Sequence, residues 1–167
     1  MDKKVLSEIA IFYGDIAMPK GFEIDRNKLQ EDILKSQINN EKFPYSREWD
    51  KLNTYLREHI QDKYNFQLIN KLTSSYLFKP NVVSIPQSDI DLMDLKNAPD
   101  FTMLYGVNVD KCKIIFYYDD NRRKGNLWKI DLDQNFFVML PSTQLYYITN
   151  NQKNSLNSIL KITYEFK

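Results

Sequence analysis

The sequence predicts an α+β protein, with helices in its N-terminal part and an antiparallel β core of the sandwich or jelly-roll type. Apolar residues recur every three or four positions over much of residues 20–65, which is the period of an amphipathic helix. From residue 66 onward the period shifts toward two, and turn residues divide the chain into short runs typical of strands. A chain of 167 residues with 43% hydrophobic content is long enough for one well-buried core and short for two. We therefore expect a single domain, 1–167, with a helical front, 1–65, and a strand-rich part, 66–167.

Two helices are expected in the front, after a short apolar strand at 9–13. They begin after Asp25 and Ser46, whose side chains accept hydrogen bonds from the first backbone N–H groups of a helix. The first helix is expected to end near Asn39 and Asn40. The apolar face of the first helix is formed by Leu29, Ile33, Leu34 and Ile38, and that of the second helix by Trp49, Leu52, Leu56 and Ile60.

The strand-rich part begins with a strand or a pair of strands at 66–78 and continues into an irregular segment, 79–100, that contains Pro80, Pro86 and Pro99. Short strands follow, separated by Asn, Asp, Gly, Pro and Ser residues of the kind that form turns. They are expected at 101–109, 113–120, 126–133, 136–142, 145–151 and 158–166. Antiparallel strands at this spacing are typical of a sandwich or jelly roll, and we expect the N-terminal helices to pack on it.

The charge and the apolar runs exclude several functions. Lys and Arg number 23 against 22 Asp and Glu, so the net charge provides no general attraction to nucleic acid or to an anionic membrane. No run approaches the roughly 18 apolar residues that cross a bilayer. The single cysteine, Cys112, has no partner for an internal disulfide, and the apolar residues after it predict a half-buried strand cysteine. We therefore expect protein partners, no nucleic acid and no membrane.

The single histidine, His59, limits the chemistry further. Its position near the end of the second helix accounts for it as a partly exposed side chain without a function. Neither a zinc site of several His and Cys nor an iron site of two His and one carboxylate can be assembled from one His and one Cys. The sequence also has no Gly-rich phosphate loop. We expect no cofactor.

Three carboxylates on the irregular segment are weak candidates for a metal site, namely Asp89, Asp91 and Asp94. Carboxylate oxygens are ligands of Ca²⁺ and Mg²⁺. Their spacing departs from that of the EF-hand loop, however, and no Gly stands where that loop needs one. Alternating polar and apolar residues on a connecting segment are the commoner explanation.

A basic hairpin tip is a candidate binding site. It contains Arg122, Arg123 and Lys124, with Trp128 close behind. Arginine and lysine bind phosphates and acidic partners, and an aromatic ring nearby offers a stacking surface. The preceding residues Asp119 and Asp120 partly neutralise this tip, which disfavours nucleic acid. A solvated hairpin tip is the ordinary alternative.

The stretch MLPSTQLYYITNN, residues 139–151, and the strand after it resemble the C-terminal part of the 2-oxoglutarate/Fe(II) oxygenase family. That family has a jelly-roll fold, the double-stranded β-helix. There, a strand reaches a Pro-Ser pair, a metal-binding histidine follows, and the last strand opens with an arginine for 2-oxoglutarate. Carried onto this chain, the resemblance places Tyr146 at the histidine and Ile159 near the arginine. The family's upstream His-x-Asp pair falls at Lys96, Asn97 and Asp100.

The resemblance implies a jelly roll in which the metal and cosubstrate positions have been replaced, because neither a facial triad nor a charged partner for 2-oxoglutarate remains. The mouth of such a jelly roll would be lined by Tyr146, Tyr147, Asn150 and Asn151. Successive side chains of a strand point to opposite faces, so only one of the two tyrosines can lie in the mouth. We therefore predict a non-catalytic protein that acts by binding.

The segments DIAMPKGFEIDR, SREWDKLNTYL, YYDDNRRKGN and LPSTQLYYITNNQ are also similar to uncharacterised proteins of marine T4-like phages. This similarity implies a virion-associated structural or accessory component, located in the virion or the host cytoplasm, with virion proteins or further copies of the chain as partners. Two alternatives stay open. One is a divergent 2-oxoglutarate/Fe(II)-type oxygenase or another small-molecule enzyme. The other is a glycan- or small-ligand-binding module that uses Trp128, Tyr146 and Tyr147 as an aromatic platform.

Overall fold

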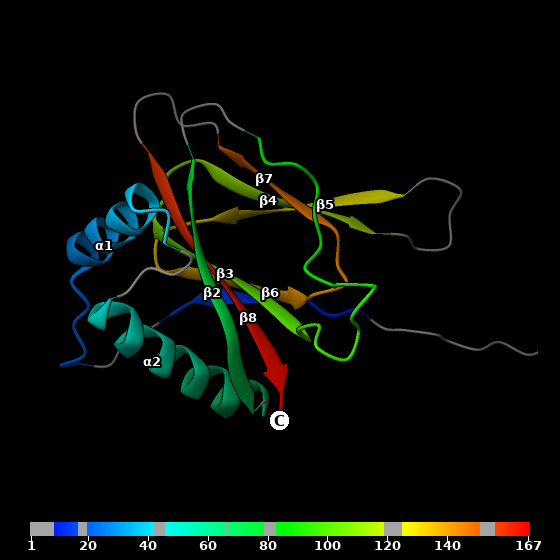
Figure 1. Ribbon diagram of the computed structural model, residues 1–167, viewed down its shortest axis with the longest axis horizontal. Coiled ribbons are helices and arrows are strands. Elements are labelled where there is room, and N and C mark those ends of the chain that lie inside the picture. Colours follow the sequence, from blue (N-terminus) through cyan, green and yellow to red (C-terminus); the bar gives the residue numbers. More distant parts are fainter. Residues whose placement is uncertain are drawn as a thin grey trace, which may run out of the picture.

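Two antiparallel sheets lie face to face, and two helices pack on the outer face of the larger sheet (Figure 1). The structure, a computed structural model, describes residues 9–16, 20–41, 46–65, 67–78, 83–118, 125–150 and 156–167, with the backbone alone at 76–78. The larger sheet, sheet A, contains β1 (Phe12–Asp15), β2 (Leu68–Phe78), β3 (Phe101–Asn108), β6 (Phe136–Pro141) and β8 (Asn157–Phe166). The smaller sheet, sheet B, contains β4 (Cys112–Tyr118), β5 (Asn126–Leu132) and β7 (Tyr146–Asn150).

The strand order is that of a jelly roll. Sheet A has the order β1-β6-β3-β8-β2 and sheet B the order β5-β4-β7, and every pairing is antiparallel. From β3 onward the chain passes from sheet A to β4 and β5 of sheet B, returns to A with β6, and then visits β7 and β8. This repeated crossing between two sheets defines the double-stranded β-helix. The predicted jelly-roll fold is confirmed at this level, and each predicted strand after residue 100 is present.

The helices α1 (Arg26–Ile38) and α2 (Arg47–Tyr64) begin directly after the two predicted capping residues. Asp25 accepts a hydrogen bond from the backbone N–H of Lys28 at 3.0 Å. Ser46 accepts one from the N–H of Trp49 at 3.4 Å. The four predicted apolar residues of α2 are all buried, as are Leu29 and Ile33 of α1. These side chains form one hydrophobic cluster with the outer face of sheet A.

One detail of the helices differs from the sequence predictions. Ile38 is 79% exposed, because it lies about two and a half turns after Leu29 and so on the side of α1 opposite to the buried face. Ser36 is buried in its place and donates its hydroxyl to the carbonyl of Ile33. His59 is half-buried, which agrees with the predicted partly exposed side chain. Its ring lies 6.4 Å from that of Phe137, and its Nε2 has no hydrogen-bond partner among the described residues.

The central strands of sheet A, β3, β6 and β8, are buried on both faces. On β8, Leu160, Ile162 and Tyr164 belong to the cluster shared with the helices, whereas Ile159 belongs to the cluster between the two sheets. Because side chains alternate along a strand, Lys161 points with Ile159 into the space between the sheets. A lysine at such a position needs an anion nearby.

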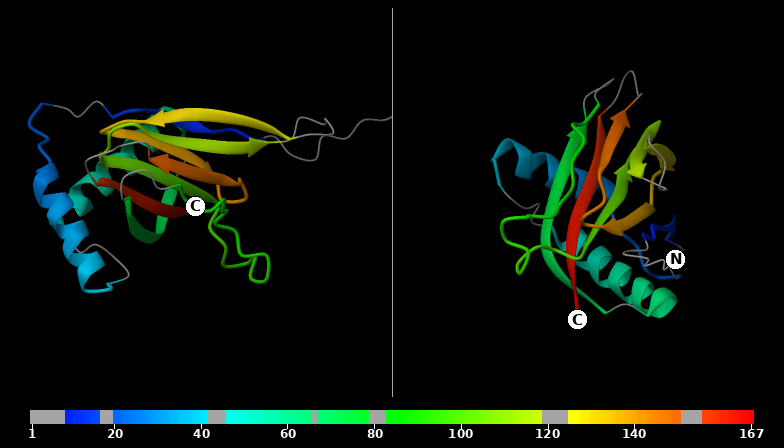
Figure 2. Two further views of the ribbon diagram at one scale, coloured as in Figure 1. Left: turned by 90° about the horizontal axis from the view of Figure 1, so that it is seen from above. Right: turned by 90° about the vertical axis from the view of Figure 1, so that its right-hand side faces the viewer.

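The predicted irregular segment between β2 and β3 has no regular strand or helix in its described part, residues 83–100. Isolated bridges join Val83 to Thr149 and Gln87 to Tyr146, so the segment first runs along the free edge of β7. It then forms turns near residues 91–97 that extend away from the sheets (Figure 2). Within the ranges that the structure describes, neither helix is long and apolar enough to cross a membrane.

Candidate functional site

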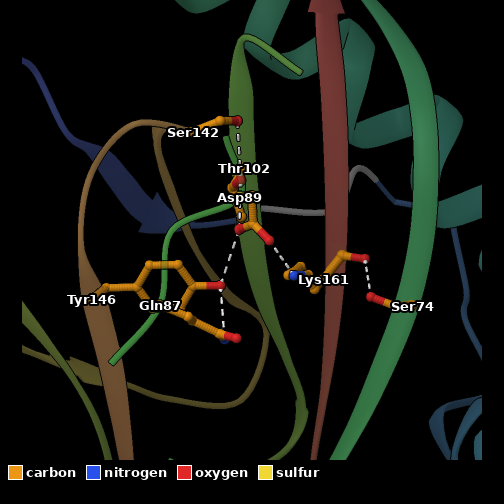
Figure 3. Close-up of polar contacts among 7 residues, drawn as sticks. All are labelled: Ser74, Gln87, Asp89, Thr102, Ser142, Tyr146 and Lys161. Carbon is orange, nitrogen blue, oxygen red and sulfur yellow. Dashed lines mark hydrogen bonds and ion pairs between the residues drawn. The ribbon is translucent and has the colours of Figure 1, made fainter. Parts of the chain in front are cut away.

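A cluster of polar side chains lies at one end of the space between the sheets (Figure 3). We call it the Asp89 cluster, and it consists of Gln87, Asp89, Thr102, Ser142, Tyr146 and Lys161. These residues come from the 83–100 segment, β3, the residue after β6, β7 and β8. The fold therefore brings five separate parts of the chain to one place.

Asp89 is the centre of this cluster. Its Oδ1 forms an ion pair with the ammonium group of Lys161. Its Oδ2 accepts hydrogen bonds from the hydroxyls of Thr102, at 2.9 Å, and Tyr146, at 3.2 Å. The side chains of Lys161 and Asp89 are only 12% and 11% exposed. Both charged groups are thus almost removed from water, and each neutralises the other.

Two further contacts extend the cluster. The Nε2 of Gln87 donates to the hydroxyl oxygen of Tyr146 at 3.3 Å. The hydroxyls of Thr102 and Ser142 lie 3.2 Å apart. The side chains of Gln87, Tyr146 and Asp89 therefore meet end to end, with their polar atoms within hydrogen-bond distance of one another.

Backbone hydrogen bonds hold the 83–100 segment in register with its neighbours. Gln87 and Tyr146 exchange both backbone hydrogen bonds, each at 2.9 Å. The N–H of Asp89 donates to the carbonyl of Ser142 at 2.9 Å, and the N–H of Ser142 donates to the carbonyl of Asp100 at 3.0 Å. Backbone hydrogen bonds alone therefore fix the positions of Gln87 and Asp89, independently of their side-chain contacts.

The structure separates the other residues that the sequence singled out. Tyr146 is fully buried in the Asp89 cluster, whereas Tyr147 lies on the outer face of sheet B with its ring 5.5 Å from that of Tyr117. Asn150 is buried at the other end of β7 and accepts a hydrogen bond from Asn157 at 2.7 Å. Trp128 stacks on Phe116, with ring centroids 5.5 Å apart. The basic residues Arg122, Arg123 and Lys124 lie outside the described residues.

The three predicted carboxylates do not converge. Asp91 accepts a hydrogen bond from the N–H of Met93 at 2.9 Å, and Asp94 accepts from the side chain of Asn97 at 2.9 Å. These are local turn contacts, and only Asp89 reaches the cluster. Over the described ranges, no group of three or more His, Cys, Asp or Glu side chains is placed to hold a metal ion.

The position expected for the upstream pair stays a prediction. Asp100 accepts a hydrogen bond from the N–H of Phe166 at 2.7 Å. The residues that meet Tyr146 are Gln87 and Asp89, because the segment passes along β7 before it turns away. Their spacing, one residue apart, is that of a His-x-Asp pair, and this signal is present in the sequence. Lys161 has a weaker signal, a single charge between apolar residues of the last strand.

The comparisons with solved structures agree with this architecture. A prolyl hydroxylase from Trichoplax adhaerens, solved with a hypoxia inducible factor peptide, is similar with a TM-score of 0.62 at 11% identity, over 93% of this chain and 83% of that one. AviO1 from Streptomyces viridochromogenes has a TM-score of 0.64 at 11% identity, over 94% and 90%. A prolyl-4-hydroxylase from Pseudomonas putida has a TM-score of 0.61 at 12% identity, over 86% and 83%. The chain thus has the fold of 2-oxoglutarate/Fe(II) oxygenases.

Sequence comparisons add no closer relative. No family model matches the chain, and no curated protein matches it. At 11–12% identity, the likeness to the oxygenases concerns the fold.

The side chains of the Asp89 cluster do not fit the Fe(II) that this fold implies. Ferrous iron in such sites is bound by two imidazoles and one carboxylate. The cluster offers one carboxylate, one phenol, one amide and two aliphatic hydroxyls, and its carboxylate already pairs with an ammonium group. The sole imidazole of the chain, His59, lies on the helix side of sheet A. Iron chemistry therefore has no ligand set here.

Proposed function

We propose that this chain is a non-catalytic protein of oxygenase-like fold that acts by binding other protein subunits. The observation that carries the proposal is the ion pair between Asp89 and Lys161 beside Tyr146, the residue that the resemblance places at the metal histidine. A carboxylate that is neutralised by an internal ammonium has no need of a divalent ion. The fold is retained, and its metal chemistry is replaced by internal contacts.

An exposed apolar surface beside the cluster favours protein binding. The 83–95 segment exposes Val83, Ile85, Leu92, Met93 and Leu95. Met93 is 95% exposed and Leu92 is 75% exposed, at the turns that extend away from the sheets. Exposed apolar side chains that gather on one segment mark interaction sites more often than isolated ones do. Asp91 and Asp94 stand between these residues, so a partner with an apolar pocket and a basic rim would be complementary.

The partner that we propose is a subunit of a phage virion, which is what the resemblance of the four sequence segments named above implies. The test is quantitative peptide mass spectrometry on purified, nuclease-treated particles of a phage whose genome carries this sequence, with the major capsid protein as reference. A fixed copy number per particle supports the proposal. Absence from particles, with abundance in infected cells, rejects a virion role.

The binding surface is tested separately with paired variants. Leu92→Asp with Met93→Asp should abolish incorporation into particles or co-purification with the virion subunit, because both side chains are exposed and available to a partner. Ile38→Asp is the matched control, since Ile38 is equally exposed but lies at the end of α1. Equal loss in both variants, or in neither, would reject the 83–95 segment as the surface.

A second candidate function is oxygenase catalysis, and the fold of the similar structures favours it. This function requires Asp89 to release Lys161 and other ligands to come from outside the described cluster. The test is 2-oxoglutarate turnover with Fe(II) by the wild-type chain, together with the Asp89→Asn variant. Turnover that disappears in Asp89→Asn would replace the first proposal with this one.

A further inference from the structure

The charges of the Asp89 cluster stand in surroundings that would otherwise be apolar. The neighbouring layer between the sheets is formed by Leu104, Val138, Leu140 and Ile159. An unpaired carboxylate in such a place is costly, because the protein interior does not replace the water that it loses. Asp89 therefore needs a cation, and the ammonium of Lys161 supplies it from β8.

The arrangement around this ion pair is that of a site with replaced ligands. Gln87 and Asp89 have the one-residue spacing of a His-x-Asp pair, and Tyr146 takes the position of the downstream histidine. The hydrogen bonds from Gln87 to Tyr146 and from Tyr146 to Asp89, at 3.3 Å and 3.2 Å, place all three side-chain ends together. Imidazoles at positions 87 and 146 would therefore present their nitrogens next to the Asp89 carboxylate.

We infer that the Asp89 cluster is a converted metal site in which the ammonium of Lys161 is the resident cation. Asp89 remains as the original type of ligand, Gln87 and Tyr146 stand in for two imidazoles, and Lys161 carries the positive charge that an ion would bring. The inference rests on the non-catalytic half of the proposed function. It goes further, because it predicts that three substitutions return the site to divalent-cation binding.

The conversion also has a structural consequence. The ion pair fastens the 83–100 segment to β8, and the hydrogen bond between Asp89 and Thr102 fastens it to β3. The segment that exposes Leu92 and Met93 is thus held in place by side chains of the chain itself. An exchangeable metal ion would hold it only when bound, whereas a lysine holds it permanently.

The first experiment is a Co²⁺ titration, followed by ligand-field absorption and calorimetry. The samples are the wild type, the variant Gln87→His/Tyr146→His/Lys161→Ala, and the same variant with Asp89→Asn added. We expect no stoichiometric binding by the wild type, about one Co²⁺ per chain in the triple variant, and loss of that binding with Asp89→Asn, since two imidazoles and a carboxylate suit this ion. Failure of a folded triple variant to bind Co²⁺ would overturn the inference.

A second measurement needs no redesigned site. Brief acetylation of the wild-type protein, read by peptide mass spectrometry, compares Lys161 with Lys71, whose ion pair to Glu165 is more exposed. Lys161 should react at least about tenfold more slowly, because its reaction requires local opening. Asp89→Asn should abolish this protection. If Lys161 reacts as fast as Lys71, the ammonium is not a resident cation, whether or not the triple variant folds.

The outcomes separate this inference from the proposed function. Stoichiometric Co²⁺ binding by the wild type that depends on Asp89 would reject both. Absence of binding in the wild type and in a folded triple variant would reject the converted site alone. Absence of the wild-type chain from particles, with the expected Co²⁺ results, would reject the virion role alone.

Discussion

Asp89 and Lys161 stand 72 positions apart in the sequence and form an ion pair that joins the irregular 83–100 segment to β8. Lys161→Met keeps the aliphatic stem and removes the charge, which leaves the Asp89 carboxylate in a nearly dry site. Removing one partner of a buried pair costs about 3–5 kcal/mol. We expect the free energy of unfolding, measured with urea, to decrease by an amount near the lower end of that range, because Thr102 and Tyr146 still donate to Asp89.

The matched control for that variant is Lys71→Met. Lys71 pairs with Glu165 at 3.0 Å between β2 and β8, but the two side chains are 28% and 42% exposed. Exposed pairs contribute about 0–1 kcal/mol, so this change should be nearly neutral. The double variant Asp89→Asn/Lys161→Met should recover part of the loss, since it leaves no unpaired charge. Equal costs for Lys161→Met and Lys71→Met would show that the buried pair has no special role.

Gly106 on β3 has no room for a side chain. A Cβ at this position would lie 2.2 Å from the carbonyl oxygen of Asp133 and 2.8 Å from a methyl carbon of Val109. The backbone must therefore shift, and Gly106→Ala should lower the free energy of unfolding by about 1–3 kcal/mol, the usual cost of overpacking. Gly14→Ala on β1 is the control, because its Cβ would meet only a ring carbon of Phe137 at 3.9 Å. Chemical denaturation of both variants measures the two costs. An unchanged free energy of unfolding in Gly106→Ala would contradict the close approach of Asp133 to Gly106.

The thiol of Cys112 is predicted to be inert in the folded protein. Cys112 is 1% exposed, and burial raises its pKa to about 12. With that pKa, roughly one thiol in ten thousand is ionised near pH 8, and the thiolate is the reactive form. We expect iodoacetamide to modify Cys112 only after unfolding in urea, as followed by intact-mass spectrometry. Rapid modification of the native protein would mean that this end of β4 opens readily.

Local features of the sequence predicted the elements well. The N-caps Asp25 and Ser46 and the apolar stripe of α2 depend on residues three or four positions apart. Contacts over such short distances can be predicted from the sequence pattern. The exposure of Ile38 follows from the same geometry, because Ile38 lies about two and a half turns after Leu29 and thus on the opposite side of α1; the predicted apolar face of this helix was too wide.

The candidate site was only partly predictable. Tyr146 was found through its distance from Pro141-Ser142, which is local. Asp89 and Lys161 were not paired beforehand, because their contact depends on how the chain alternates between the two sheets. The irregular segment added a further uncertainty, since nothing in its composition fixes which residues run along β7. The backbone bridge at Gln87 settles this register.

Alkaline pH should destabilise the protein through its buried tyrosines. Burial raises the pKa of Tyr105 to about 12 from a usual 10.0, and it raises the pKa of the fully buried Tyr164 as well. A group with a raised folded-state pKa holds its proton more tightly when folded, so its contribution to stability is complete below about pH 10 and is lost as the pH rises through about 12. Each such group should lower the free energy of unfolding by about 1.4 kcal/mol per pH unit in that window.

The measurement for this prediction is urea unfolding at several pH values, with phenolate absorbance recorded in parallel. The absorbance of Tyr105 and Tyr164 should appear only with unfolding, because their hydroxyls donate to Asn135 at 2.7 Å and to Asn53 at 3.1 Å, respectively. Tyr105→Phe removes one ionising group and should make the pH dependence shallower by about one proton. A stability that is unchanged between pH 8 and 11, or the same slope in Tyr105→Phe, would contradict the burial of the Tyr105 hydroxyl.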